Sequence, residues 1–143
     1  MIEYKLSSAV LVFNSSDELA LQLRASEDDS FPGHWDFSAG GGIDEGENHK
    51  DAAKRELFEE LGVQTEPEFL TKMIFKYHAW NSQIQRESTV FMYKAKYGGV
   101  FNPDPKEVKD IQFFKITKIQ EMIDNSSRFH PEFLQAFKMI KEL

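Results

Sequence analysis

Hydrophobic residues recur along the chain at two different spacings, and each spacing predicts a different kind of element. The segment 4–13 is rich in Val, Leu and aromatic residues, and Leu19, Leu21 and Leu23 alternate with other side chains. Both segments are typical of β-strands, and the polar stretch 14–17 between them is typical of a turn. Further strands are predicted at 35–39, from about 69 to 78, at 88–97 and at 110–116.

Three other segments of the chain have the hydrophobic spacing of helices. Ala53, Leu57 and Leu61 lie four residues apart, so the segment 48–61 is predicted as a helix with Gly62 as its stop signal. A short helix is expected over 117–124, and an apolar stripe predicts another over 131–143. No repeat or linker interrupts the chain. The sequence therefore predicts an α/β domain over residues 1–143, a mixed sheet between helices.

Turns and loops are also predicted between these elements, including breaks at Gly98-Gly99 and at 102–105. The run Gly-Gly-Gly-Ile-Asp-Glu-Gly at 40–46 is interpreted as a loop, because glycine allows backbone angles that other residues avoid. The segment 27–33 is a polar loop that ends in Pro-Gly, and 80–85 is a polar turn.

Composition excludes several classes of function. The chain of 143 residues contains no Cys, which rules out disulfides, Cys-ligated zinc and thiol catalysis. Its formal net charge of -7 is unlike that of a protein that binds a nucleic-acid polymer. The first residues do not read as a signal peptide, and no apolar run is long enough for a membrane span. A cytoplasmic protein without a membrane partner is therefore expected.

The chemistry is concentrated on the helix predicted at 48–61. Glu56, Glu59 and Glu60 stand at i, i+3 and i+4, so they share one side of the helix and repel one another. A solvated acidic face would have the same composition, but this crowding favours a bound counterion. Sites made only of oxygen ligands suit hard cations such as Mg²⁺ or Mn²⁺. Arg55 can pair with one carboxylate, and Glu47 can reach back toward the same cluster.

The spacing of these residues resembles the complete Nudix box of a known hydrolase family. All fixed positions are present, in the pattern Gly41-x5-Glu47-x7-Arg55-Glu56-Leu57-x-Glu59-Glu60-x-Gly62-Val63. The resemblance implies the Nudix α/β/α sandwich with a mixed sheet. It also implies Mg²⁺- or Mn²⁺-dependent hydrolysis of a phosphoanhydride bond by water.

The resemblance also implies a role for each box residue. Glu56, Glu59 and Glu60 would be metal ligands, and the backbone carbonyl of Gly41 or its neighbour Gly40 would complete the shell. Many relatives add an acidic residue from a later loop. Glu107 occupies the corresponding stretch, with Asp104 as its rival.

The catalytic roles implied by the box are less specific. Glu59, Glu47 and Glu107 are all candidates for the base that accepts the proton of the attacking water. Arg55 would hold Glu47 or another carboxylate in place.

The box does not specify the group attached to the diphosphate. A nucleotide sugar, ADP-ribose, a dinucleotide and a nucleoside triphosphate all stay open as the small-molecule partner. Arg24, Trp35, His78 and Arg86 are the candidate substrate-binding residues, although each is also an ordinary core or surface residue for a strand. A homodimer also stays open.

Two other functions are weighed against hydrolysis. The Pro-Gly-His-Trp-Asp approach at 32–36 resembles the branch related to isopentenyl diphosphate isomerase. That isomerase uses a Cys in the stretch that matches 37–39, where this chain has Phe-Ser-Ala, and its box is degenerate. A nucleotide-binding sensor domain is the second alternative, but such domains usually lose the acidic ligands, and this chain keeps them.

Overall fold

The sheet is mixed and has the long strand β1 at its centre. The computed structural model describes residues 1–25 and 30–143. Strand β1 (Ile2–Phe13) pairs in parallel with β6 (Gln85–Lys96), and β6 pairs with the antiparallel strand β5 (Glu68–His78). On its other side, β1 pairs with two antiparallel strands, β4 (Ala39–Gly42) along its middle and β2 (Leu19–Arg24) at its end. Strand β2 also pairs with β3 (Trp35–Asp36) and β7 (Val108–Phe114).

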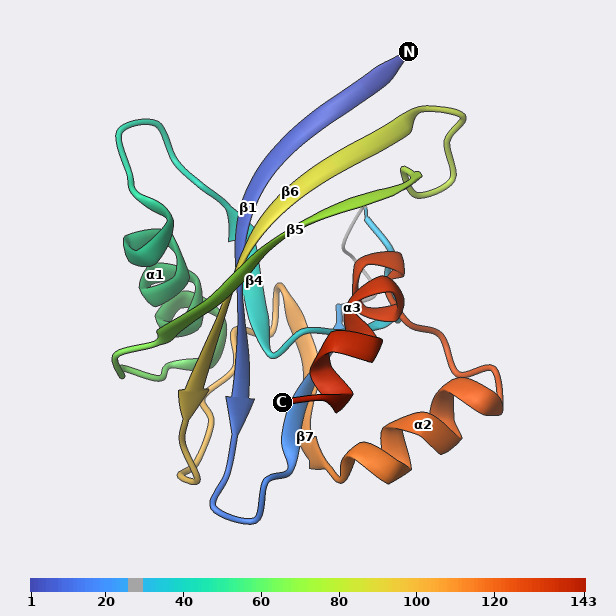
Figure 1. The fold of residues 1–143 in the computed structure, drawn as a ribbon. Coiled ribbons are helices and arrows are strands. Elements are labelled where there is room, and N and C mark those ends of the chain that lie inside the picture. The colour runs from blue at the N-terminus through green and yellow to red at the C-terminus, as the bar shows by residue number, and fades with distance from the viewer. Residues whose placement is uncertain (26–29) are drawn as a thin grey trace.

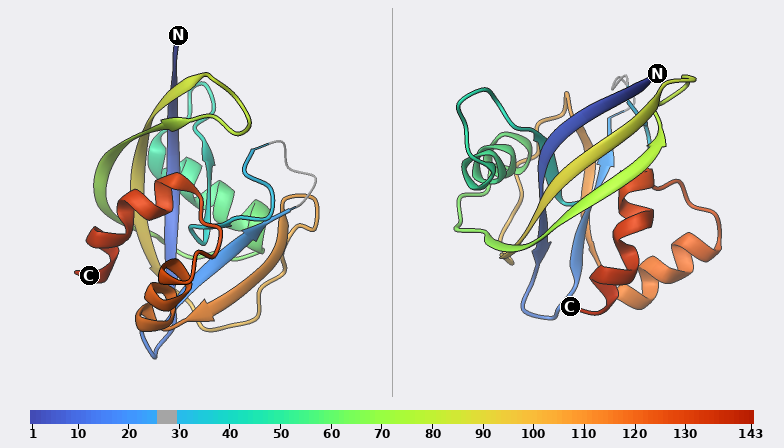
Figure 2. Two further views of the ribbon diagram at one scale, coloured as in Figure 1. Left: turned by 90° about the vertical axis from the view of Figure 1, so that its right-hand side faces the viewer. Right: turned by 45° about the horizontal axis from the view of Figure 1, so that its top comes forward.

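Helices cover both faces of this sheet (Figure 1). Helix α1 (His49–Leu61) packs on one face, and α2 (Ile116–Asp124) and α3 (Pro131–Lys141) lie on the other, as both views in Figure 2 show. The predicted α/β/α sandwich with a mixed sheet is therefore confirmed. Among the described residues, no helix combines the length and the apolar character that a membrane crossing requires.

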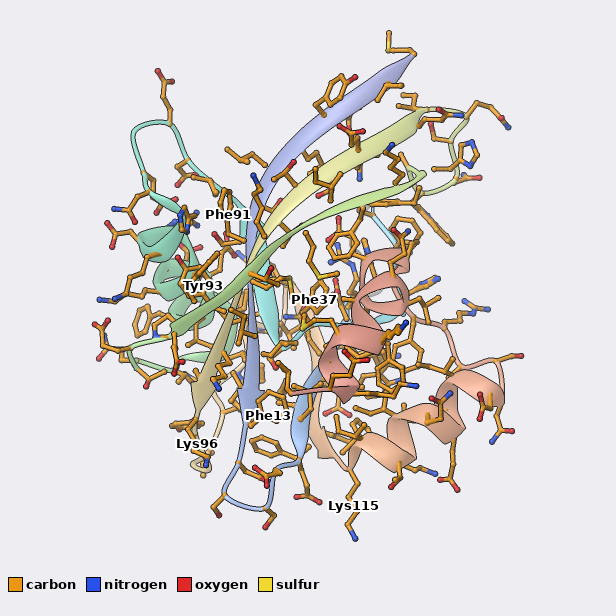
Figure 3. All side chains as sticks on the ribbon, viewed as in Figure 1. Phe13, Phe37, Phe91, Tyr93, Lys96 and Lys115 are labelled. Carbon is orange, nitrogen blue, oxygen red and sulfur yellow. The ribbon has the colours of Figure 1, made fainter. Side chains whose placement is uncertain are left out.

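Alternation along the strands produces two separate hydrophobic cores. Val10 and Tyr93 belong to the cluster under α1, whereas Leu11 and Phe37 belong to the cluster under α2 and α3. Figure 3 shows Phe91 and Tyr93 on the α1 side of the sheet and Phe37 on the α3 side. Because successive side chains of a strand point to opposite faces, one strand supplies both cores.

The helix predicted at 48–61 is confirmed, as α1 at His49–Leu61, and so is Gly62 as the residue that ends it. The side chain of Asn48 caps the N-terminus of α1 by accepting a hydrogen bond from the backbone N–H of Asp51. At the other end, Gly62 adopts a left-handed conformation with φ of 69°, which costs glycine little. These two caps fix where the acidic helix begins and ends, and so fix the position of its glutamates.

The structure corrects the prediction that 40–46 is entirely a loop. Gly40 to Gly42 belong to β4 and pair with Ser7 to Ala9 of β1. A Cβ atom on Gly40 would lie 2.9 Å from the carbonyl oxygen of Ser8, so glycine is needed here for close packing of a strand.

Smaller corrections concern the ends of other elements. Gln85 begins β6 instead of ending a turn, and Ile116 begins α2 instead of ending a strand. In the polar loop predicted at 27–33, residues 27–29 lie outside the described residues, and a bend and turn follow at 30–33.

Candidate metal centre and cleft

Three glutamates form a carboxylate cluster at one end of α1. Glu56 and Glu60 come from the helix, and Glu107 comes from the turn before β7. One carboxylate oxygen from each lies within 4.8 Å of the others. Glu56 is 9% exposed and Glu60 is 7% exposed, whereas Glu107 is open to solvent. The cluster is therefore buried at Glu56 and Glu60 and accessible to solvent at Glu107.

The glycines of β4 allow the helix carboxylates to approach the sheet. A Cβ atom on Gly41 would lie 2.5 Å from Oε1 of Glu56, a distance that real side chains do not tolerate. The backbone N–H of Gly40 donates to Oε1 of Glu60 at 2.9 Å, and the side chain of Gln22 donates to the same oxygen at 3.2 Å. The strand thus both makes room for the carboxylates and orients one of them.

Burial makes it costly for these glutamates to carry their charge together. Burial raises the pKa of Glu56 to about 7, although the neighbouring guanidinium of Arg55 opposes the shift. Burial also raises the pKa of Glu60 well above its usual range, and the charges of Glu56 and Glu107 add to that shift. Two buried carboxylates that resist ionisation beside a third acidic side chain fit a divalent cation, because a cation would stabilise all three charges.

Arg55 holds the acidic residues that surround the cluster. Its Nε and Nη2 atoms donate to the two carboxylate oxygens of Glu47 at 2.8 and 3.0 Å, and Nη1 donates to Oε1 of Glu56 at 2.8 Å. Nη2 also donates to the carbonyl of Gly42 at 3.0 Å. The two-point bond to Arg55 lowers the pKa of Glu47 to about 2. The guanidinium of Arg55 therefore contacts the loop before α1, strand β4 and the carboxylate cluster at the same time.

Glu59 lies apart from the other two helix glutamates. Its side chain is 54% exposed, and its carboxylate is 3.3 Å from Nη1 of Arg55. Within the described part of the chain, it does not join the cluster of Glu56, Glu60 and Glu107. Of the three predicted helix ligands, the structure brings two into the cluster and leaves the third on its exposed flank.

Of the two acidic candidates near β7, the structure places Glu107 and not Asp104 in the cluster, among the described residues. The Oδ1 atom of Asp104 accepts from the backbone N–H of Lys106 at 3.0 Å, and its carbonyl accepts from the N–H of Glu107 at 3.0 Å. Its own N–H donates to the carbonyl of Glu60 at 2.9 Å. Asp104 therefore shapes the turn that brings Glu107 next to the helix.

A cleft of about 80 Å³ lies beside the cluster. Gly40, Gly41 and Gln22 line the cleft and also contact the clustered glutamates, so the two features adjoin. Arg24 lines the cleft too, and its Nη1 atom lies 3.1 Å from the carboxylate of Asp36. The remaining charged or polar walls include Lys5, Asp36, Tyr77, His130 and Glu132.

Of the four predicted substrate-binding residues, Arg24 is the one that lines this cleft. Trp35 packs on the core under α2 and α3, with its ring 5.3 Å from that of Phe114. His78 and Arg86 line a separate depression near the β5–β6 hairpin, where Arg86 bonds Glu3 at 2.6 Å. The structure therefore places three of these side chains outside the cleft next to the cluster.

Sequence reasoning missed most of the cleft walls. Gln22 carries the clearest overlooked signal, because it is a polar residue that is 4% exposed between the leucines of a strand. His130 and Glu132, at the start of α3, reach the cleft only because that helix packs on the sheet. No local pattern marks them.

Comparison with known proteins agrees with the fold and the box. The sequence model described as NUDIX domain matches residues 3–137. The chain belongs to the Nudix family. It is a Nudix hydrolase by this match and by its relatives, and an RNA pyrophosphohydrolase of Campylobacter jejuni subsp. doylei is 31% identical over 135 residues. That alignment covers 85% of this chain and 84% of the relative.

A second Nudix relative matches over a shorter stretch. A Nudix hydrolase of Pseudomonas aeruginosa is 47% identical over 55 residues, which is 38% of this chain. The match spans 32% of that protein's length.

Solved Nudix structures share the architecture at low sequence identity. A MutT protein from Methanosarcina mazei has a TM-score of 0.78 at 18% identity and covers 99% of this chain and 97% of its own. The Nudix domain of Shewanella oneidensis NrtR, solved with ADP ribose, has a TM-score of 0.75 at 19% identity, with 97% and 87% covered. At these identities, the likeness shows the fold.

Proposed function

We propose that this Nudix hydrolase depends on Mg²⁺ or Mn²⁺ and cuts a phosphoanhydride bond in a nucleoside-diphosphate-linked small molecule. The observation that carries the proposal is the carboxylate cluster of Glu56, Glu60 and Glu107, which adjoins a cleft lined by Lys5 and Arg24. An acidic cluster beside basic side chains suits a substrate whose diphosphate is shared between a metal and the protein.

The metal would be held by the cluster, with Glu59 and the carbonyl of Gly41 as further candidate ligands. When bound, it would neutralise diphosphate charge and lower the pKa of a water molecule at the site. Glu60 is oriented for this role by the N–H of Gly40, and Glu56 is oriented by Arg55. These contacts fix the carboxylates before any ligand arrives.

The proposed base is Glu59 or Glu107, not Glu47. A general base works best when its pKa lies near the working pH, and Arg55 holds the pKa of Glu47 at about 2. We assign Glu47 a positioning role, in which it fixes Arg55 through two hydrogen bonds. Glu59 and Glu107 are both exposed, so a water molecule can reach either carboxylate.

The substrate class can be tested with a panel of compounds and Mg²⁺. ADP-ribose belongs in the panel because the NrtR domain was solved with it. RNA with a 5′-triphosphate end also belongs there, because the Campylobacter jejuni relative is an RNA pyrophosphohydrolase, although a net charge of -7 favours a small molecule over a polymer. Release of nucleotide or phosphate from a small molecule is the expected result. Tight binding without turnover of any compound would support the sensor alternative instead.

Metal binding is expected to stabilise the folded protein. With Mg²⁺ or Mn²⁺ at about 100 times its Kd, linkage gives roughly 2.7 kcal/mol. For a chain of this size, that corresponds to a rise in Tm of roughly 5–10 °C. Differential scanning fluorimetry over a metal titration measures it, and a constant Tm would contradict a metal site.

The same titration at several pH values tests the cause of the stabilisation. Glu56 has a pKa of about 7 in the folded chain against 4.5 as its ordinary value, so between these values the folded state holds more protons than the unfolded state. Stability of the metal-free protein should therefore fall as pH rises from 4.5 to 7. A divalent cation favours the ionised cluster, so the stabilisation by Mg²⁺ should grow over the same range.

A further inference from the structure

The first residues of β1 form a sheet edge that lacks a neighbouring strand. Strand β6 pairs with β1 over its whole length, from Ile2 to Phe13. On the opposite side, β4 pairs only with Ser7 to Val10. The last contact along this side is the hydrogen bond from the N–H of Ile43, just beyond β4, to the carbonyl of Leu6. Within residues 1–25 and 30–143, no strand pairs with 2–6 on that side.

The backbone of this edge is set up to accept another strand. Since the carbonyl of Leu6 faces the β4 side, the alternation of a strand turns the N–H and C=O groups of Tyr4 and Ile2 to the same side. Natural sheets usually protect such edges with a proline, a bulge, a covering helix or charged side chains, and this edge carries the charges of Glu3 and Lys5, which are opposite in sign. Residues 2–6 contain no proline and pair with β6 without a bulge, whereas the β5 edge is bulged and contacts α3.

The side chains on this edge are apolar and exposed on one face. Ile2, Tyr4 and Leu6 alternate along β1 and are 48%, 70% and 53% exposed. They share a face with Val10 and Val12, which α1 covers further along the strand. Figure 1 shows that the start of β1 extends beyond both layers of helices. Glu3 and Lys5 alternate with them along β1, so their side chains point to the opposite face.

We propose that this edge binds a second copy of the chain, with the two β1 strands antiparallel and Tyr4 facing Tyr4 across a two-fold axis. Such a strand would run in the same direction as β4 and continue its line along β1 beyond Gly42. The pair of Tyr4 residues would exchange two backbone hydrogen bonds, because the outward N–H and C=O groups are those of Tyr4.

The charges at this edge select the register. With Tyr4 facing Tyr4, Glu3 of each copy faces Lys5 of the other, and Ile2 faces Leu6, so the segment complements itself. A shift by two residues in one direction places Glu3 against Glu3, and the opposite shift places Lys5 against Lys5. A shift by one residue turns apolar side chains against charged ones. Since Lys5 also lines the cleft, Glu3 of the second copy would lie beside the cleft.

A single introduced cysteine tests the register, because the natural chain has none. Tyr4→Cys places two thiols on residues whose Cα atoms would be about 5.5 Å apart, a separation that a disulfide spans. Mild oxidation of the folded protein should give a covalent dimer in high yield. Val100→Cys is the matched control, because Val100 is 89% exposed but lies outside this edge, and it should stay monomeric on a denaturing gel.

Charge reversal tests the same pairing without covalent chemistry. Sedimentation equilibrium of the unmodified chain should show a dimer that dissociates on dilution. Glu3→Lys or Lys5→Glu alone should weaken association at least tenfold, because each places like charges opposite one another. The double variant Glu3→Lys/Lys5→Glu should recover it, although Glu3→Lys also removes the bond to Arg86 in both cases.

Each outcome decides the proposal. A monomer at all concentrations overturns it. A dimer whose dissociation constant is unchanged by both charge reversals uses another surface and also overturns it. The same holds if Tyr4→Cys does not cross-link faster than Val100→Cys. Circular dichroism of each variant separates a lost interface from a lost fold.

Discussion

Glu60→Gln is expected to lower Mg²⁺-dependent turnover by roughly a hundredfold or more while the protein stays folded. A metal contributes several kcal/mol to the transition state, and each 1.4 kcal/mol or so is tenfold in rate. Gln keeps the oxygen that accepts from Gly40 and Gln22, but it removes one charge from the cluster. Because burial opposes that charge, the metal-free variant should be as stable as the natural chain or more so. Steady-state kinetics and Tm without metal measure the two effects.

Glu66→Gln is the control for this prediction. Glu66 lies on the surface, where its carboxylate pairs with Lys54 at 2.7 Å and with Lys50 at 3.4 Å. Surface pairs of this kind contribute little to stability, so activity and Tm should change little. Full activity of Glu60→Gln, or equal losses in both variants, would remove Glu60 from the metal site.

The helix pattern predicts that three carboxylates share one side of α1, and helix geometry explains why only two of them meet in the folded chain. At 3.6 residues per turn, Glu60 lies about 40° from Glu56 around the axis, whereas Glu59 lies about 100° from Glu60. The close pair faces β4, and Glu59 falls on the exposed flank. The spacing i, i+3, i+4 identifies a common side of the helix, but only the packed sheet determines which members are buried.

Long-range features were beyond what spacing along the chain can show. Glu107 lies in the sequence far from the box, and it became a candidate through the family resemblance alone. Its position beside Glu60 depends on the N–H of Asp104 donating to the carbonyl of Glu60. The cleft likewise draws its walls from β1, β2 and the start of α3, which no periodicity connects.

The three glycines at 40–42 show why a run of glycine is ambiguous in a sequence. Such a run can serve backbone freedom in a loop or close packing against a strand. Three consecutive glycines suggest a loop when only backbone freedom is considered, and that reasoning predicted no strand at 40–42. In the folded chain, the absence of side chains matters more, since Glu56 occupies the space beside Gly41 that a side chain would take. Only the position of α1 relative to β4 reveals that requirement.

Gly41→Ala is therefore expected to damage the site more than its small size suggests. The new Cβ would meet Oε1 of Glu56 at 2.5 Å and its carboxyl carbon at 2.6 Å. Because Glu56 is buried and bonded to Arg55, its carboxylate would have to move away from Glu60 and Glu107. Displacement of one ligand should weaken metal binding by roughly 10–100-fold, as loss of supporting contacts does in other metal sites. Mn²⁺ titration by calorimetry measures the change, and turnover should fall in parallel.

Gly42→Ala supplies the matched comparison one residue along the same strand. A Cβ atom at Gly42 meets nothing within 4 Å, and its φ is not positive, so alanine fits there. Metal affinity should stay within about twofold, and stability should be unchanged or slightly higher, because alanine restricts the unfolded chain. If both alanine variants bound Mn²⁺ equally well, Glu56 would not be a ligand held against β4. If both failed equally, the effect would belong to the strand backbone and not to the space reserved for that carboxylate.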